Sequence, residues 1–132
     1  MIEFTVPGIP VPKGRPRFGK GRTYTPADTV AAERTVAIYA LRACRKPMTG
    51  PLRLGVVFYV PIPKDSTKAR FVARLSGSER PITKPDLDNY LKLVLDACNR
   101  IVYADDNQVV EIVATKWYSD KPNTLVTVEP IE

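Results

Sequence analysis

The stretch from Lys84 to Asp106, KPDLDNYLKLVLDACNRIVYADD, combines a helical pattern of apolar residues with pairs of acidic residues near its two ends. The apolar residues recur at spacings of three and four, which is typical of one buried face of a helix. They are Leu87, Leu91, Val94, Leu95 and Cys98. We therefore predict a helix that packs through one side and presents charged residues beside that side.

The acidic pairs are Asp86 with Asp88 at the start of this helix and Asp105 with Asp106 after its end. Because Pro85 marks an extended entry, Asp86 and Asp88 can point the same way if the link into the helix is extended. Like charges repel unless a cation or a proton lies between them, and carboxylate oxygens favour hard cations such as Mg²⁺. The joint placement of the four acids predicts a divalent-metal site.

Each acid also has an ordinary structural explanation when it is taken alone. Asp88 is a good N-cap residue type, and Asp88 with Lys92 makes an i, i+4 ion pair of the kind common on helix surfaces. Asp105 and Asp106 are typical of a turn before a strand. These explanations compete with the metal site.

The basic residues are concentrated near the N-terminus. The 132-residue chain has a formal net charge of +6, which fits a polyanionic partner or simply a basic surface. No acid occurs between Glu3 and Asp28, whereas Phe18 and Tyr24 lie there among Lys13, Arg15, Arg17, Lys20 and Arg22. Such a mixture can hold phosphates while it stacks on bases, so we expect it to bind DNA. The alternative is a solubilising loop whose aromatic residues pack into the core.

Several classes of protein are excluded or disfavoured by residue content. The absence of histidine excludes mechanisms that use imidazole as base, nucleophile or metal ligand. Cys44 and Cys98 lack the close spacing of a zinc site, so we interpret both as small buried residues in a reducing cytoplasm. The start of the chain is strand-like rather than a signal peptide, and no apolar run approaches the ~18 residues that a membrane span needs.

The remaining chain predicts alternating strands and helices. The first half of the chain predicts a strand at 2–6, an extended and partly mobile basic arm at 7–23, a helix from 26 to about 45 and a buried strand at 52–60. An irregular basic stretch with short helical turns follows at 64–83, and the acidic helix comes after it. The chain then predicts strands at 108–118 and 124–128, joined as an antiparallel hairpin. The irregular stretch is equally compatible with a solvated crossover and with a substrate contact. This order predicts one compact α/β or α+β domain, 1–132, with two main helices packed on a mixed, largely antiparallel sheet.

Two sequence blocks resemble the RusA family of Holliday-junction resolvases, which are crossover junction endodeoxyribonucleases. The blocks are DLDN at 86–89 with Lys92 following, and ADDNQVV at 104–110 leading into a strand. The resemblance also covers the order of elements along nearly the whole chain, including the basic N-terminal segment that ends in GRTYTP.

This resemblance implies specific roles for the residues of the two blocks. Asp86, Asp88 and Asp106 would bind the metal and Lys92 would be a catalytic cation, while Asp105 and Asn89 would support the metal ligands. Apart from the resemblance, Lys84 belongs to a second run of basic residues, and we expect it to contact DNA together with the arm. The family implies a homodimer that uses Mg²⁺, or Mn²⁺ as a substitute, without an organic cofactor, to cut four-way junctions symmetrically in DNA recombination and repair. Its usual sources are bacterial and prophage genomes.

The chemistry is consistent with this family for reasons that do not depend on the resemblance. Phosphodiester hydrolysis without histidine needs a metal ion to activate the attacking water and to stabilise charge in the transition state, and clustered carboxylates supply its ligands. Three other functions remain open: a basic module that binds DNA without cutting it, a metal-dependent nuclease acting on RNA or flaps, and a structural protein of a phage.

Overall fold

The computed structural model describes residues 1–14, 17–19, 22–24 and 26–131, and for 17–19 and 22–24 only the backbone is described. The elements are β1 (Ile2–Pro7), β2 (Arg17–Gly19), β3 (Arg22–Tyr24), α1 (Ala27–Ala43), β4 (Leu52–Pro61), α2 (Lys68–Ser76), α3 (Leu87–Cys98), the 3₁₀ turn η1 (Asp106–Gln108), β5 (Val109–Ser119) and β6 (Asn123–Pro130).

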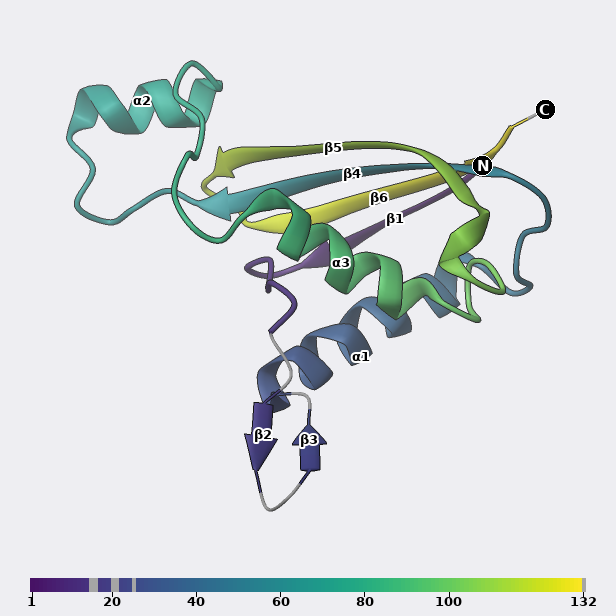
Figure 1. Ribbon diagram of the computed structural model, residues 1–132. Coiled ribbons are helices and arrows are strands. Elements are labelled where there is room, and N and C mark those ends of the chain that lie inside the picture. Colours follow the sequence, from purple (N-terminus) through teal and green to yellow (C-terminus); the bar gives the residue numbers. More distant parts are fainter. Residues whose placement is uncertain (15–16, 20–21, 25, 132) are drawn as a thin grey trace.

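The main sheet has four strands in the order β1-β6-β4-β5. Strand β4 pairs in parallel with β5, whereas the β4–β6 and β1–β6 pairs are antiparallel. Helices α1 and α3 lie side by side against one face of this sheet, and α2 lies beyond its end (Figure 1). The predicted α+β class with a mixed, largely antiparallel sheet is therefore confirmed.

The predicted hairpin between the last two strands is wrong. Strand β6 lies between β1 and β4, so Leu54 of β4 is opposite Val128 of β6 on one side and Ile112 of β5 on the other. The turn after β5 reverses the chain, as its residues predict, but β4 separates the two strands that it joins. Alternating polarity identifies strands and their buried faces, but the choice of partner depends on contacts from the whole sheet.

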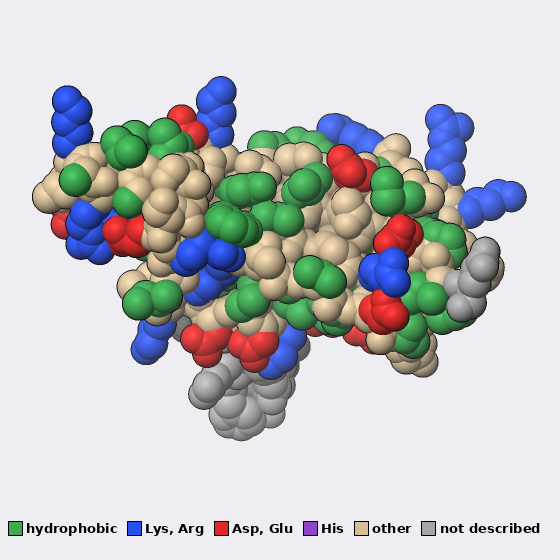
Figure 2. All heavy atoms as spheres, turned by 90° about the horizontal axis from the view of Figure 1, so that it is seen from above, with side chains coloured by type: hydrophobic (Ala, Val, Ile, Leu, Met, Phe, Trp, Pro, Cys, Tyr) green, Lys and Arg blue, Asp and Glu red, His purple; other side chains and the backbone are tan. Residues whose placement is uncertain are grey.

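The core lies between the sheet and the helices α1 and α3. Alternate residues of β4 point into it, and Leu52, Leu54, Val56 and Phe58 are all almost fully buried. Both cysteines are buried and unpaired, as predicted. The opposite face of the sheet is left uncovered by α1 and α3, and Figure 2 shows hydrophobic side chains gathered on it.

The buried face of α3 differs from the predicted one by a rotation about the helix axis. Its buried residues are Tyr90, Leu93, Val94, Ala97 and Cys98. Three residues of the predicted stripe, Leu87, Leu91 and Leu95, are only half-buried at the margin of the core. Both sets have helical spacing, and only the position of the sheet decides between them.

Two other segments are more ordered than predicted. The basic arm includes the short antiparallel pair β2–β3, which projects beyond α1 (Figure 1). The stretch at 64–83 contains a full helix, α2, which begins at the cap Thr67, whose hydroxyl accepts the Arg70 N–H, and ends at Gly77 with a φ of 87°. Glycine is favoured at that position because other residues are strained at positive φ.

No helix among the described residues is long and apolar enough to cross a membrane.

Candidate active site

The first acidic pair lies at the start of α3. Asp86 is the N-cap residue, with extended backbone angles, but its side chain makes no capping hydrogen bond. Asp88 lies in the first turn, and both side chains are exposed. The carboxylate of Asp86 is therefore available to a ligand, and it lies at the helix end where the backbone dipole favours negative charge.

Lys92 lies one turn beyond Asp88 on the same face of α3. The distance from its Nζ to Asp88 Oδ2 is 3.8 Å, and both side chains are largely exposed. An ion pair of this length in water is weak, so the ammonium of Lys92 is free to move to another anion.

The segment that leads into Asp86 is held from β5. Lys116 Nζ donates hydrogen bonds to the carbonyl oxygens of Thr83 and Pro85, at 3.0 and 3.1 Å. Arg80 donates to the Lys116 carbonyl oxygen, and its guanidinium lies over the Trp117 ring. These contacts fix the direction from which the chain enters α3 and so position Asp86 and Asp88.

The second acidic pair lies on the turn η1 after α3. The Asp105 carboxylate accepts the Asn107 N–H, so Asp105 acts as the cap of this turn. Gln108 accepts the N–H groups of Ala104 and Asp105 through Oε1 and donates through Nε2 to the carbonyl oxygens of Met48 and Gly50. Gln108 thereby ties the acidic turn to the segment before β4.

The two acids of this turn differ in their proton affinity. The hydrogen bond from the Asn107 N–H lowers the pKa of Asp105. The pKa of Asp106 is raised, chiefly because the protonated Asp106 side chain can donate a hydrogen bond to the Asp105 carboxylate. Burial and the negative charges of Asp105 and Asp96 add smaller contributions. Of these two acids, Asp106 is therefore the one whose negative charge the protein compensates less, and a bound cation would relieve the repulsion.

One chain does not bring the two acidic pairs together. Asp86 and Asp88 lie at the start of α3, whereas Asp106 interacts electrostatically with Asp96 in the last turn. The 12 residues of α3 separate these ends by about 18 Å. Accordingly, the described residues contain no group of three or more acidic, cysteine or histidine side chains that could hold a metal ion. A single chain thus does not fit a metal ion bound jointly by Asp86, Asp88 and Asp106.

Lys13, predicted to contact DNA, is engaged within the protein. Its ammonium bonds Glu33 of α1 and lies 3.0 Å from Asp96 of α3. Partial burial lowers the pKa of Lys13, but the hydrogen bonds to these two acids outweigh it and the net shift is upward. The Lys13 N–H also donates to the Asn89 carbonyl oxygen. Lys13 therefore fastens the base of the arm to both helices beside the DLDN block.

The other predicted DNA contacts divide into two groups. Lys84 is exposed and lines a cavity beside the start of α3. The side chains of Arg15, Arg17, Phe18, Lys20, Arg22 and Tyr24 lie outside the described residues, so their roles stay predictions.

Sequence reasoning missed Lys116 and Gln108 as organisers of the two acidic segments. Gln108 belongs to the DD-x-Q-V-V block, so that block offered a signal for it. Lys116 lies in a strand pattern and contacts residues 31 and 33 positions away, and no local pattern indicates this.

Comparison with known proteins gives two findings. The sequence profile of the family described as "Endodeoxyribonuclease RusA" matches residues 7–129. The "Uncharacterized protein YqaN" of Bacillus subtilis (strain 168) is 39% identical over 139 aligned positions, which cover 98% of this chain and 96% of the relative. The profile match includes both acidic segments, the arm and all four strands of the main sheet at least in part.

Proposed function

The chain belongs to the RusA family of endodeoxyribonucleases, and from this premise we propose that it is a magnesium-dependent enzyme that resolves four-way DNA junctions in recombination and repair. The observation that carries the proposal is the DLDN segment at the start of α3. There the Asp86 carboxylate makes no capping bond, Asp88 is exposed, and Lys92 lies one turn away in a weak ion pair. Within the described part of the chain, these two carboxylates and this cation are available to a ligand.

Asp86, Asp88 and Asp106 are the residues that we assign to Mg²⁺. When bound, the ion would lower the pKa of the attacking water and stabilise charge on the phosphate, and so supply water activation in a protein that has no histidine. Mn²⁺ has similar ligand preferences and is the expected substitute. Asp105 would hold the turn that presents Asp106.

The homodimer follows from the separation of the acids. Two chains related by a twofold axis that place their α3 helices antiparallel would bring Asp86 and Asp88 of one chain toward Asp106 of its partner. The result would be two sites, each built from both chains, as the two cuts of a symmetric junction require.

A surface suited to this contact runs along α3. Leu87, Leu91 and Leu95 recur every four residues and are only half-buried, so they form an apolar ridge that the described part of the chain covers only in part. Ridges of this spacing pack well between helices. Contact through the middle of the ridge, near Leu91, would set the start of one α3 beside the end of the other.

Lys92 would act on the DNA. Its ammonium can leave the weak pair with Asp88 and bind the scissile phosphate or the leaving oxygen, where charge develops during hydrolysis. The charge of +6 would attract DNA without regard to sequence.

A second candidate function is a basic module that binds DNA without cutting it. It is favoured by one observation, that the described part of a single chain assembles no metal-binding group. In this case Asp86 and Asp106 would be ordinary residues of a helix start and a turn.

Cleavage of a labelled four-way junction with and without Mg²⁺ separates these functions. We expect paired cuts only with Mg²⁺, and little cutting of duplex, flap or RNA hairpin of equal length. Asp86→Asn or Asp106→Asn should abolish cleavage and leave junction affinity equal or higher, because each removes a negative charge. Asp120→Asn, in the exposed turn before β6, is the matched control. Near wild-type cleavage by Asp86→Asn and Asp106→Asn would contradict the assignment, and binding without cleavage under any condition would favour the second function.

A further inference from the structure

A cavity of about 250 Å³ lies beside the segment that leads into Asp86. Thr83, Lys84 and Pro85 of that segment line it, together with Tyr90 of α3 and Lys116 and Tyr118 of β5. None of its described lining residues is acidic. Its volume is below the roughly 300–1,000 Å³ of pockets that enclose a whole small molecule, so it suits one group of a larger ligand.

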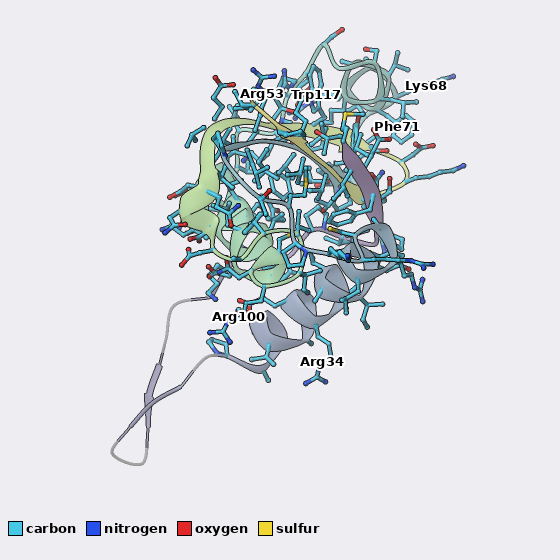
Figure 3. All side chains as sticks on the ribbon, turned by 90° about the vertical axis from the view of Figure 1, so that its right-hand side faces the viewer. Arg34, Arg53, Lys68, Phe71, Arg100 and Trp117 are labelled. Atoms are coloured by element: carbon cyan, nitrogen blue, oxygen red, sulfur yellow. The ribbon has the colours of Figure 1, made fainter. Side chains whose placement is uncertain are left out.

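Lys116 contributes a positive charge that is fixed in position. Its ammonium is held by two neutral carbonyl oxygens, those of Thr83 and Pro85, and within the described part of the chain it pairs with no carboxylate. A lysine ammonium has three N–H donors, so one remains available for an anion in the cavity. Neighbouring residues of a strand point to opposite faces, and Trp117 accordingly lies on the uncovered side of the sheet (Figure 3), with Arg80 over its ring.

Tyr90 contributes an aromatic ring with a hydroxyl to the wall of the cavity. Its side chain is only 4% exposed and its ring stacks on Phe58 at 5.2 Å between centroids. The hydroxyl makes no hydrogen bond to any residue that the structure describes. Among the described contacts, the hydroxyl is thus left to donate to an acceptor in the cavity.

We propose that this cavity binds a backbone phosphate of the DNA strand next to the phosphate that is cleaved, with Lys116 and Lys84 supplying charge and Tyr90 supplying a neutral hydrogen-bond donor. The inference rests on the proposed function, since it names a further contact for the same substrate. The phosphate is an anion with several acceptor oxygens, which matches two ammonium groups and one hydroxyl. Because Lys116 also holds the chain before Asp86, the bound phosphate and the catalytic acids would share one rigid support.

The test combines protein variants with junctions in which single phosphates are replaced by neutral groups, and it measures binding affinity for each combination. Junctions that carry a single methylphosphonate at each position around the cleavage site are titrated in EDTA with wild-type protein, Lys116→Met and Lys116→Arg. For the wild type, one position should weaken binding most. Lys116→Met should bind the normal junction more weakly, with a salt slope lower by about one unit, and should lose no further affinity at that position. Lys116→Arg should restore most of the effect because it keeps the charge.

Two further variants separate a phosphate contact from loss of structure or of general charge. Tyr90→Phe keeps the ring on Phe58. When the same phosphate is made neutral, this variant should lose less affinity than the wild type does, and at every other phosphate the two proteins should lose the same. Lys68→Met removes an equal charge from α2, where Lys68 projects into solvent (Figure 3), and should keep the wild-type response to every methylphosphonate. Melting curves check that each variant is folded.

If Lys116→Met and Tyr90→Phe lose affinity at each neutral phosphate as the wild type does, the cavity is not a phosphate site, whereas the proposed function stands as long as the wild type cuts junctions. A wild-type protein that neither binds nor cuts them would overturn both.

Discussion

At the scale of single residues, replacing Lys92 shows whether its contact is catalytic or structural. If Lys92 only pairs with Asp88 on the helix surface, Lys92→Ala costs under about 1 kcal/mol and does not change turnover. A contact to charge in the transition state should instead lower the single-turnover rate on the order of a hundredfold, at unchanged melting temperature. Quench-flow cleavage of a junction measures this, with Lys68→Ala as the control. Wild-type turnover in Lys92→Ala would leave the residue with a surface role alone.

The kinds of residue that form the candidate site were predictable from the sequence, but their supports were not. Two short blocks indicated Asp86, Asp88, Asp105 and Asp106 because like charges gathered in this way repel unless a cation or a proton lies between them. Lys116 and Gln108, which hold these acids in place, act across contacts of 31 to 60 positions in the chain. Such contacts arise from the packing of the sheet and have no local pattern.

At the scale of elements, α2 depends on one carboxylate. Hydrogen bonds from Arg70 and Arg74 lower the pKa of Glu79 from 4.5 to about 2. A lowered folded pKa means that this stabilisation is complete above about pH 4.5 and is lost as the pH falls toward 2. We expect the protection of the α2 amides against hydrogen exchange, taken relative to the intrinsic exchange rate at each pH, to fall over that interval.

Glu79→Gln provides the control for this pH dependence. In that variant the α2 amides should be less protected from exchange at neutral pH than in the wild type. Their protection should also change less between pH 4.5 and 2. The Trp117 side chain, which lies close to Gly77 after α2, gives a second signal in its fluorescence. An identical acid response in both proteins would show that Glu79 does not hold the helix.

The arm gives a prediction that separates its base from its tip. Lys13→Met should lower the free energy of unfolding by roughly 1 kcal/mol, because Lys13 links Glu33 and Asp96 at partly exposed positions. Arg17→Met should leave stability unchanged and lower the salt slope of DNA binding by about one unit, as expected for one phosphate contact. Urea unfolding and binding titrations measure the two effects. Equal DNA-binding losses with unchanged stability in both variants would contradict the assignment of Lys13 to structure.

The elements themselves were largely predictable, whereas their pairing was not. Alternation along 52–60 and 108–118 indicated strands β4 and β5, and the acidic stretch indicated α3. The insertion of β6 between β1 and β4, and the rotation that buries Tyr90 and Leu93 in place of Leu87 and Leu91, depend on which surfaces meet in the folded chain. Local periodicity does not contain that information.

At the scale of the whole molecule, the proposed activity requires two chains. A four-way junction needs two cuts, and the length of α3 keeps the acids of one chain too far apart for a shared metal ion. An antiparallel pair of α3 helices solves both problems, and it predicts a particle of twice the 14.7 kDa chain mass.

Complementation between two inactive chains tests this claim most directly. Asp86→Asn and Asp106→Asn chains with different tags are co-expressed, and the mixed dimer is purified and incubated with a labelled junction and Mg²⁺. If each site combines Asp86 of one chain with Asp106 of the other, the mixed dimer has one intact site and one site with both defects. It should cut one strand of the junction at up to about half the wild-type rate, whereas each variant alone is inactive. A mixed dimer as inactive as its parents would contradict a site shared between chains.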